Sequence, residues 1–159
     1  MKKISIIIMM IAFAISAKGQ SHEKEIKKFQ KELNKEYKSP KDSPLAEDQR
    51  ASFKELPFFP INAKYRVEAK FIRVKKKKTL RMKTSANQVQ TYDKYAEVVF
   101  QLDGKRYRLN VYQSHTLRKT KEYKDYLFLP FTDLTSGHET YGGGRYIDLK
   151  IPEGNTIIL

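Results

Sequence analysis

The stretch "YAEVVFQLDGKRYRLNVY", residues 95–112, decides the fold class of this chain. At its centre, Asp103-Gly104 is typical of a two-residue type I′ hairpin turn, in which both positions take positive φ. Such a turn pairs Leu102 with Lys105. It then places three apolar pairs opposite each other on one face: Phe100 with Tyr107, Val98 with Leu109, and Ala96 with Val111. A slip of one residue would turn this set to the other face, so the turn and the hydrophobic pattern predict the same register.

Alternating patterns outside the hairpin predict further strands. Apolar and charged residues alternate over Lys64–Phe71, as in a half-buried strand, and we expect Thr79–Thr84 to be its partner. Lys75–Lys78 would connect the two, because no core accepts four lysines. Other strands are expected over residues 126–131, 145–151 and 156–159. The prediction is a mainly β domain over residues 61–159, an antiparallel barrel or sandwich with N-terminal helical segments.

The segment before this domain has a helical pattern. Apolar residues three or four apart in residues 21–37 predict an amphipathic helix: Ile26, Phe29, Leu33 and Tyr37. Ser43-Pro44 is typical of an N-cap followed by proline at the first helical position, which predicts a short helix over residues 45–53. We therefore expect residues 20–60 to be a helical and proline-containing segment that packs on the β domain.

The N-terminus has the pattern of a signal peptide. Lys2 and Lys3 precede an apolar run from Ile4 to Ile15, and Ala17-Lys18-Gly19 resembles a cleavage site. The run is too short for a membrane span, which needs about 20 apolar residues. We expect cleavage after residue 19, a mature chain without a transmembrane segment, and a periplasmic or secreted location. The alternative is an uncleaved anchor.

Charge and cysteine content narrow the chemistry. The chain of 159 residues has a formal net charge of +14, and loss of residues 1–19 removes three lysines and no acid, which leaves +11. The chain has no cysteine, which excludes disulfides, a thiolate nucleophile and thiolate metal ligands. The three histidines, His22, His115 and His138, have no metal-ligand spacing. We expect neither a metal nor a cofactor.

The stretch "FTDLTSGHETYGGGRYIDL", residues 131–149, is the candidate site, with four of the seven glycines. Backbone amides of the glycine run could form a nest for an anion beside Arg145. The candidate ligand-binding residues are Tyr141, Gly142, Gly143, Gly144 and Arg145. The alternative is a tight turn into the following strand, at positions where a side chain would clash. The expected ligand is a small anion or a cell-envelope component.

Two acids of the same stretch are weak catalytic candidates. Asp133 and Glu139 could act as the acid and base of a hydrolase-like enzyme. Asp133 equally suits a turn capped by its own side chain, and Glu139 could instead form an internal pair with Arg145. Ser136 lacks the context of a nucleophile elbow. Whether the protein is an enzyme stays open at this point.

A basic face is the third candidate. Residues 64–83 contain ten basic residues and one acid, and residues 105–124 add seven more bases. Such a face could bind an anionic polymer, and the alternative is an ordinary solvated surface. Tyr65, Phe71 and Tyr107 alternate with bases and so lie on the opposite face from them, which argues against a stacking platform for nucleic acid.

The candidate stretch also carries a resemblance. The segments "SPLAEDQRASFKELPFFP", "YRVEA" and "PFTDLTSGHETYGGGRYIDL" resemble the uncharacterised bacterial domain-of-unknown-function family 1684. Its signature falls here on Phe131, Asp133, Thr135, Gly137, Glu139, Thr140, Tyr141, Gly144, Arg145 and Tyr146. Members of that family typically continue beyond this point, so the resemblance implies that the β domain is incomplete at its C-terminus. It implies no activity.

Overall fold

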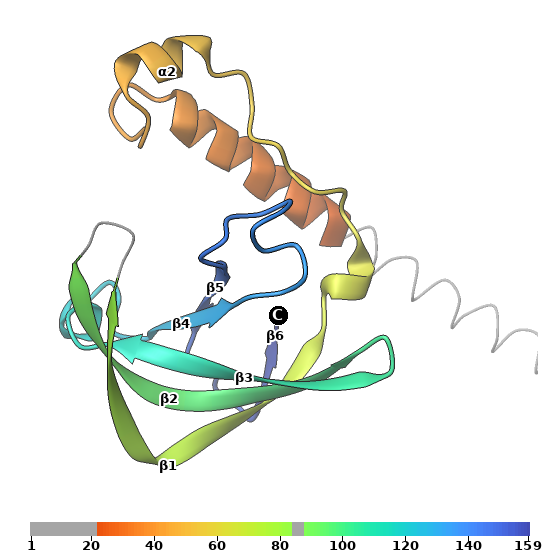
Figure 1. The fold of residues 1–159 in the computed structure, drawn as a ribbon, viewed down its shortest axis with the longest axis vertical. Coiled ribbons are helices and arrows are strands. Elements are labelled where there is room, and N and C mark those ends of the chain that lie inside the picture. The colour runs from red at the N-terminus through yellow and green to blue at the C-terminus, as the bar shows by residue number, and fades with distance from the viewer. Residues whose placement is uncertain (1–21, 84–87) are drawn as a thin grey trace, which may run out of the picture. The chain divides into compact units, whose positions relative to one another are not determined.

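The computed structural model describes residues 22–83 and 88–159, which form two units that divide between Ala63 and Lys64. The expected signal peptide, residues 1–19, lies outside the described residues. Figure 1 shows the elements of both units. No helix in the described part of the chain is long and apolar enough to cross a membrane.

The first unit contains two helices. One covers residues 22–38, and α2 covers Glu47–Ser52. Tyr37 packs on Phe53 with ring centroids 5.6 Å apart, and the Asn34 side chain accepts a hydrogen bond from the Leu56 amide at 2.9 Å. The predicted start of the short helix was wrong. Ser43 Oγ accepts from the Leu45 amide and closes a turn that precedes α2, so the helix begins later. Packing of this unit on the β domain stays a prediction.

The second unit is one antiparallel sheet of six strands in the order β5-β4-β3-β2-β1-β6. The strands are β1 (Glu68–Lys83), β2 (Val89–Leu102), β3 (Lys105–Ser114), β4 (Tyr126–Phe131), β5 (Arg145–Lys150) and β6 (Thr156–Ile158). The sheet curls into a half-barrel with β5 and β6 at its edges (Figure 1). The mainly β, antiparallel fold with N-terminal helices is thus confirmed.

The hairpin has the predicted register. Asp103 and Gly104 have φ of 51° and 72°, as a type I′ turn requires, and Leu102 pairs with Lys105. The three predicted apolar pairs all face each other across β2 and β3. Phe100 stacks on Tyr107 with ring centroids 5.6 Å apart.

The predicted pairing of the first two strands was wrong. The lysine run does not connect two paired strands, because Glu68–Lys83 is one continuous strand that pairs with β2 along its length. The register breaks between Arg73 and Lys78, where a bulge accommodates the extra residues. The bulge lets Lys75, Lys76 and Lys78 reach solvent without ending the strand. Tyr65 was expected to face inward, but it lies in a 3-10 turn, η1 (Ala63–Tyr65), and is 61% exposed.

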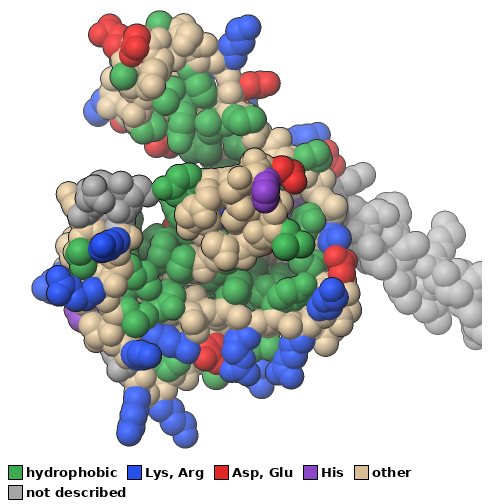
Figure 2. Space-filling model, viewed as in Figure 1, with side chains coloured by type: hydrophobic (Ala, Val, Ile, Leu, Met, Phe, Trp, Pro, Cys, Tyr) green, Lys and Arg blue, Asp and Glu red, His purple; other side chains and the backbone are tan. Residues whose placement is uncertain are grey.

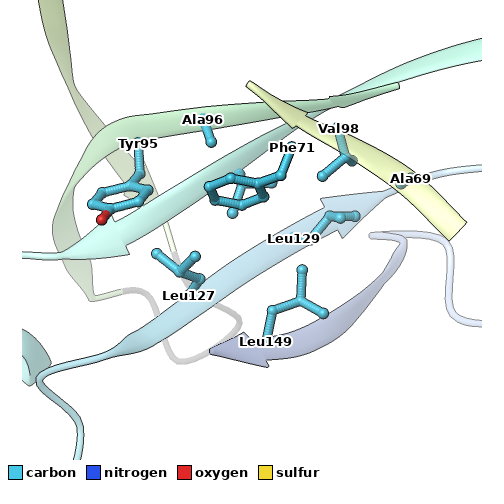
Figure 3. Close-up of a cluster of buried hydrophobic side chains, with 9 residues drawn as sticks. Ala69, Phe71, Tyr95, Ala96, Val98, Leu127, Leu129 and Leu149 are labelled. Carbon is cyan, nitrogen blue, oxygen red and sulfur yellow. The ribbon is translucent and has the colours of Figure 1, made fainter. Parts of the chain in front are cut away.

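The core fills the concave side of the curled sheet. Nine buried residues form it: Ala69, Phe71, Tyr95, Ala96, Val98, Val111, Leu127, Leu129 and Leu149. Figure 3 shows side chains of β1 and β2 pointing toward those of β4 and β5 across this space. Figure 2 shows the hydrophobic side chains in the hollow and lysine and arginine side chains along the lower rim of the sheet. The loop between β4 and β5 contains the candidate site.

Candidate functional site

The loop between β4 and β5, residues 132–144, is organised around Asp133. Its carboxylate accepts hydrogen bonds from the Thr135 amide at 3.0 Å and the Thr135 hydroxyl at 2.6 Å, and it forms an ion pair with Arg145. Arg145 also donates to the Thr135 hydroxyl at 3.3 Å, and its guanidinium lies 5.1 Å from the centroid of the Phe131 ring. Phe131 and Arg145 are cross-strand partners, so the sheet itself brings the two ends of the loop together.

Backbone hydrogen bonds fix the middle of the loop. The Thr135 carbonyl accepts from the amides of His138, Glu139 and Thr140 at 3.1, 2.9 and 3.0 Å. The Gly137 amide donates to the Thr140 carbonyl at 2.9 Å, and the hydroxyls of Thr135 and Thr140 lie 3.0 Å apart. These hydrogen bonds join residues 135–140 into a closed turn.

Gly143 and Gly144 are required to be glycine for different steric reasons. Gly144 has φ of +94°, and a Cβ on it would lie 2.6 Å from the Phe131 carbonyl oxygen. A Cβ on Gly143 would lie 2.5 Å from the Tyr141 ring, so glycine there leaves room for that ring. The Gly144 amide donates to the Tyr141 carbonyl at 3.0 Å, whereas the amides of Gly142 and Gly143 have no protein acceptor among the described residues. Gly144 therefore serves the turn, and the other two amides are not used in its hydrogen bonding.

Several side chains of the loop point to solvent. Leu134 is 97% exposed and Tyr141 is 69% exposed, and Glu139 and His138 are exposed as well. Within the described ranges the Glu139 carboxylate forms no ion pair, so the expected alternative of a Glu139–Arg145 pair does not occur. Sequence reasoning missed Leu134. Nothing in the sequence indicates that an apolar residue between Asp133 and Thr135 is exposed, because its exposure depends on the conformation of the loop.

Asp133 is poorly suited to proton transfer. The Thr135 hydroxyl, together with the Thr135 amide and Arg145, holds the pKa of Asp133 below its ordinary value. A general acid or base works best with a pKa near the working pH. No hydrogen bond joins Asp133 to Glu139 in the part of the chain that the structure describes. The arrangement holds a loop in shape and does not form an acid–base pair.

A second polar cluster surrounds a buried aspartate of β2, and sequence reasoning missed it. Asp93 on β2 is buried and accepts a hydrogen bond from the Thr79 hydroxyl at 2.7 Å. Its carboxylate also lies 2.8 Å from His115 Nε2 and 2.7 Å from Arg118 Nη1. Burial alone raises the pKa of Asp93, but the neighbouring His115, Thr79 and Arg118 side chains outweigh it and hold this pKa far below its ordinary value. Every oxygen of the carboxylate is used, which is typical of a structural ion pair.

Comparison with known proteins identifies the fold and the family. The solution NMR structure of an uncharacterised protein of Haloarcula marismortui matches with a TM-score of 0.63 and 26% sequence identity. The match covers 90% of this chain and 77% of that one. No curated protein sequence matches the chain significantly.

The sequence profile of one family matches residues 51–159, which include the whole sheet and the loop organised by Asp133. The match covers more than half of the chain and agrees with the resemblance carried by the loop. The chain therefore belongs to the family described as "Protein of unknown function (DUF1684)".

Proposed function

We propose that this protein is an exported, non-enzymatic binding domain that holds a ligand or partner at the loop between β4 and β5. One observation carries the proposal. The loop directs Asp133 and Arg145 toward each other and leaves Leu134 and Tyr141 exposed to 97% and 69% on a hydrogen-bonded frame. A rigid loop with exposed apolar and aromatic side chains loses little conformational entropy when it binds. Exposed aromatics are the residues that most often anchor such contacts.

The ligand contact combines three kinds of group. Tyr141 offers an aromatic ring, and the amides of Gly142 and Gly143 offer two donors that have no protein acceptor among the described residues. Glu139 adds a carboxylate that forms no ion pair among the described residues. Amide donors suit an anionic oxygen, and a ring suits an apolar surface next to it. We infer that the ligand is a small anionic group, either free or part of a cell-envelope component.

Arg145 has a supporting role in this proposal. Its positive charge forms an ion pair with Asp133 inside the loop, and its side chain is about one-third exposed. Arg145 therefore holds the loop in position, and other groups of the loop make the main contact with the ligand. The hydrolase-like alternative gains no support from the geometry, because Asp133 serves the loop and has a lowered pKa.

Titration followed by NMR tests the binding proposal. The purified protein is titrated with glycerol 1-phosphate, glucuronate and muramyl dipeptide, and backbone amide shifts are recorded. We expect at least one probe to shift the amides of Gly142 and Gly143, and Tyr141→Ala to abolish this shift while the rest of the spectrum is kept. Tyr65→Ala is the matched control, because Tyr65 is similarly exposed, at 61%, and lies outside the loop. Absence of loop shifts with all three probes would sink the proposal.

Export is tested separately. The proposal rests on the Lys2–Ile15–Gly19 pattern at the N-terminus. We expect the intact mass of the protein isolated from the periplasm or the medium to lack the first 19 residues, or about that number. A full-length species in the cytoplasm would contradict export and leave the binding proposal to stand on the loop alone.

A further inference from the structure

A continuous row of side chains crosses five strands on the outer face of the half-barrel. In strand order from β1 to β5 the row is Lys78, Lys94, Tyr112, Phe128 and Asp148, each the direct cross-strand partner of the next. Directly opposite residues of antiparallel strands share one face of a sheet. Their chain neighbours Val111, Leu127 and Leu149 are buried in the core, so the row faces away from it. At about 4.8 Å between strands, the row is about 19 Å long.

One half of this outer face is aromatic. The ring of Tyr92 stacks on that of Phe128 with centroids 5.6 Å apart, and Phe128 packs on Tyr146 with centroids 5.4 Å apart. Tyr146 ends the series at the edge strand β5 and is 61% exposed. Beside it, the Tyr126 hydroxyl donates to the exposed carboxylate of Asp148 at 2.6 Å. The aromatic half therefore presents an apolar ridge with a hydrogen-bond acceptor at its end.

The other half is cationic. The bulge in β1 leaves Lys75, Lys76 and Lys78 exposed and without an ion pair in the described ranges. Next to them, Lys94 and Arg108 share the single carboxylate of Glu97. Lysine and arginine side chains gather along this part of the sheet in Figure 2. The positive charge here is only partly compensated.

We propose that this outer face binds a strand of an acidic polysaccharide. Sugar rings have apolar C–H faces that pack on aromatic rings, and their hydroxyls donate hydrogen bonds to a carboxylate such as that of Asp148. Their carboxylate, phosphate or sulfate groups complement the cationic half, in which Lys75, Lys76 and Lys78 form no ion pair among the described residues. A flexible chain can follow a row across a curved sheet. The inference does not rest on the loop between β4 and β5, since it uses another surface.

Other anionic partners fit less well. A flat membrane meets the convex side of a curled sheet only along a narrow strip. Nucleic acid binding relies on open ring faces for stacking bases. Here Tyr92 and Phe128 stack on each other, which leaves Tyr146 as the most exposed ring of the three. Lys94 and Tyr112 are cross-strand partners and therefore share a face of the sheet.

Calorimetry with the purified protein tests this inference. The probes are an oligogalacturonate, a malto-oligosaccharide of the same length, single-stranded DNA, and vesicles that contain phosphatidylglycerol, all at low salt. We expect oligogalacturonate to bind tightest. Tyr146→Ala is expected to weaken its binding about tenfold, the size of one good aromatic contact. Lys78→Gln is expected to weaken it about threefold and to reduce its dependence on salt.

Matched controls separate this surface from general charge and exposure. Tyr65→Ala removes a tyrosine with the same 61% exposure elsewhere, and Lys31→Gln removes an exposed lysine of the first unit. Both are expected to change the affinity by less than about twofold. Because the Lys78 side chain is exposed, its variant keeps the test decisive even if Tyr146→Ala fails to fold.

Three results would overturn the inference. One is equal binding of the neutral and acidic oligosaccharides, or no binding of either. Another is tighter binding of DNA or vesicles than of oligogalacturonate. The third is an equal loss of affinity in the control variants.

Discussion

Two aspartates of this protein hold similar partners in different surroundings. Asp93 contacts a threonine, a histidine and Arg118, and its side chain is 6% exposed. Asp133 contacts a threonine and Arg145, and its side chain is 40% exposed. The first lies within the sheet, and the second lies on a surface loop.

The difference in burial decides what each cluster contributes. When a buried carboxylate loses its charge, its partners are left without a counter-charge in a site that water reaches poorly. When an exposed carboxylate is lost, water replaces it at little cost. We therefore assign the Asp93 cluster to global stability and the Asp133 cluster to the local shape of the loop. Under this assignment, substitutions at Asp93 should lower the free energy of unfolding most, and substitutions at Asp133 least.

Asp93→Asn is expected to have the largest effect. It removes the anion shared by His115 and Arg118, and breaking one partner of a buried ion pair costs about 3 kcal/mol. Urea denaturation gives the free energy of unfolding. A loss below about 1 kcal/mol would mean that the cluster behaves like a surface pair.

Acid should remove the same contribution gradually. The pKa of Asp93 lies far below its ordinary value in the folded protein, so its stabilisation is fully present above the unfolded pKa of about 4. The stabilisation is lost as the pH falls from there toward the folded pKa. Urea denaturation at a series of pH values should show a steeper loss below about pH 4 in the wild type than in Asp93→Asn. Parallel curves for the two proteins would contradict this account.

Two of the glycines with positive φ, Gly144 and Gly104, should respond differently to replacement by alanine. Gly144→Ala adds backbone strain and a contact of 2.6 Å with the Phe131 carbonyl oxygen, which together should cost about 2 kcal/mol. Gly104→Ala adds strain alone, because no atom lies within 4 Å of its Cβ, and should cost about 1 kcal/mol. Thermal unfolding of both variants measures the difference. Equal losses would show that the turn at Gly144 relaxes freely.

Asp133→Asn is expected to have the smallest global effect. Its ion pair with Arg145 is partly solvated, and such pairs contribute at most about 1 kcal/mol. The free energy of unfolding should therefore change by less than that amount in urea denaturation. A loss as large as that of Asp93→Asn would make the loop part of the structural core and remove the distinction between the two clusters.

Local signals in the sequence predicted the hairpin, and tertiary contacts explain what could not be predicted. Asp103-Gly104 and the alternating residues beside it lie within one short stretch, so turn chemistry and pattern were both readable. The bulge in β1 depends on what faces it from β2, and the lysine run alone suggested a loop. Asp93 lies 25 residues from Arg118, and nothing in the spacing relates them.

The sequence marked the loop between β4 and β5 as the candidate site, but only part of its internal bonding could be predicted. The glycines and Arg145 marked the loop between β4 and β5, and the need for a tight turn at Gly144 was one of the two expectations for it. The partner of Arg145 could not be chosen from sequence, because Asp133 and Glu139 both lie within reach along the chain. The loop's fold decides it, since the Thr135 bonds bring Asp133 and not Glu139 to Arg145.

We expect the Asp133–Arg145 pair to stabilise the conformation of the loop without supporting the rest of the fold. Amide hydrogen exchange of the loop in Asp133→Asn tests this expectation. The amides to follow are those of His138, Glu139 and Thr140, which all donate to the Thr135 carbonyl. We predict that they exchange about tenfold faster in the variant, which corresponds to about 1.4 kcal/mol of local opening. Amides of β2 and β3 should keep their wild-type rates. Unchanged loop rates, or equal acceleration throughout the sheet, would contradict the account.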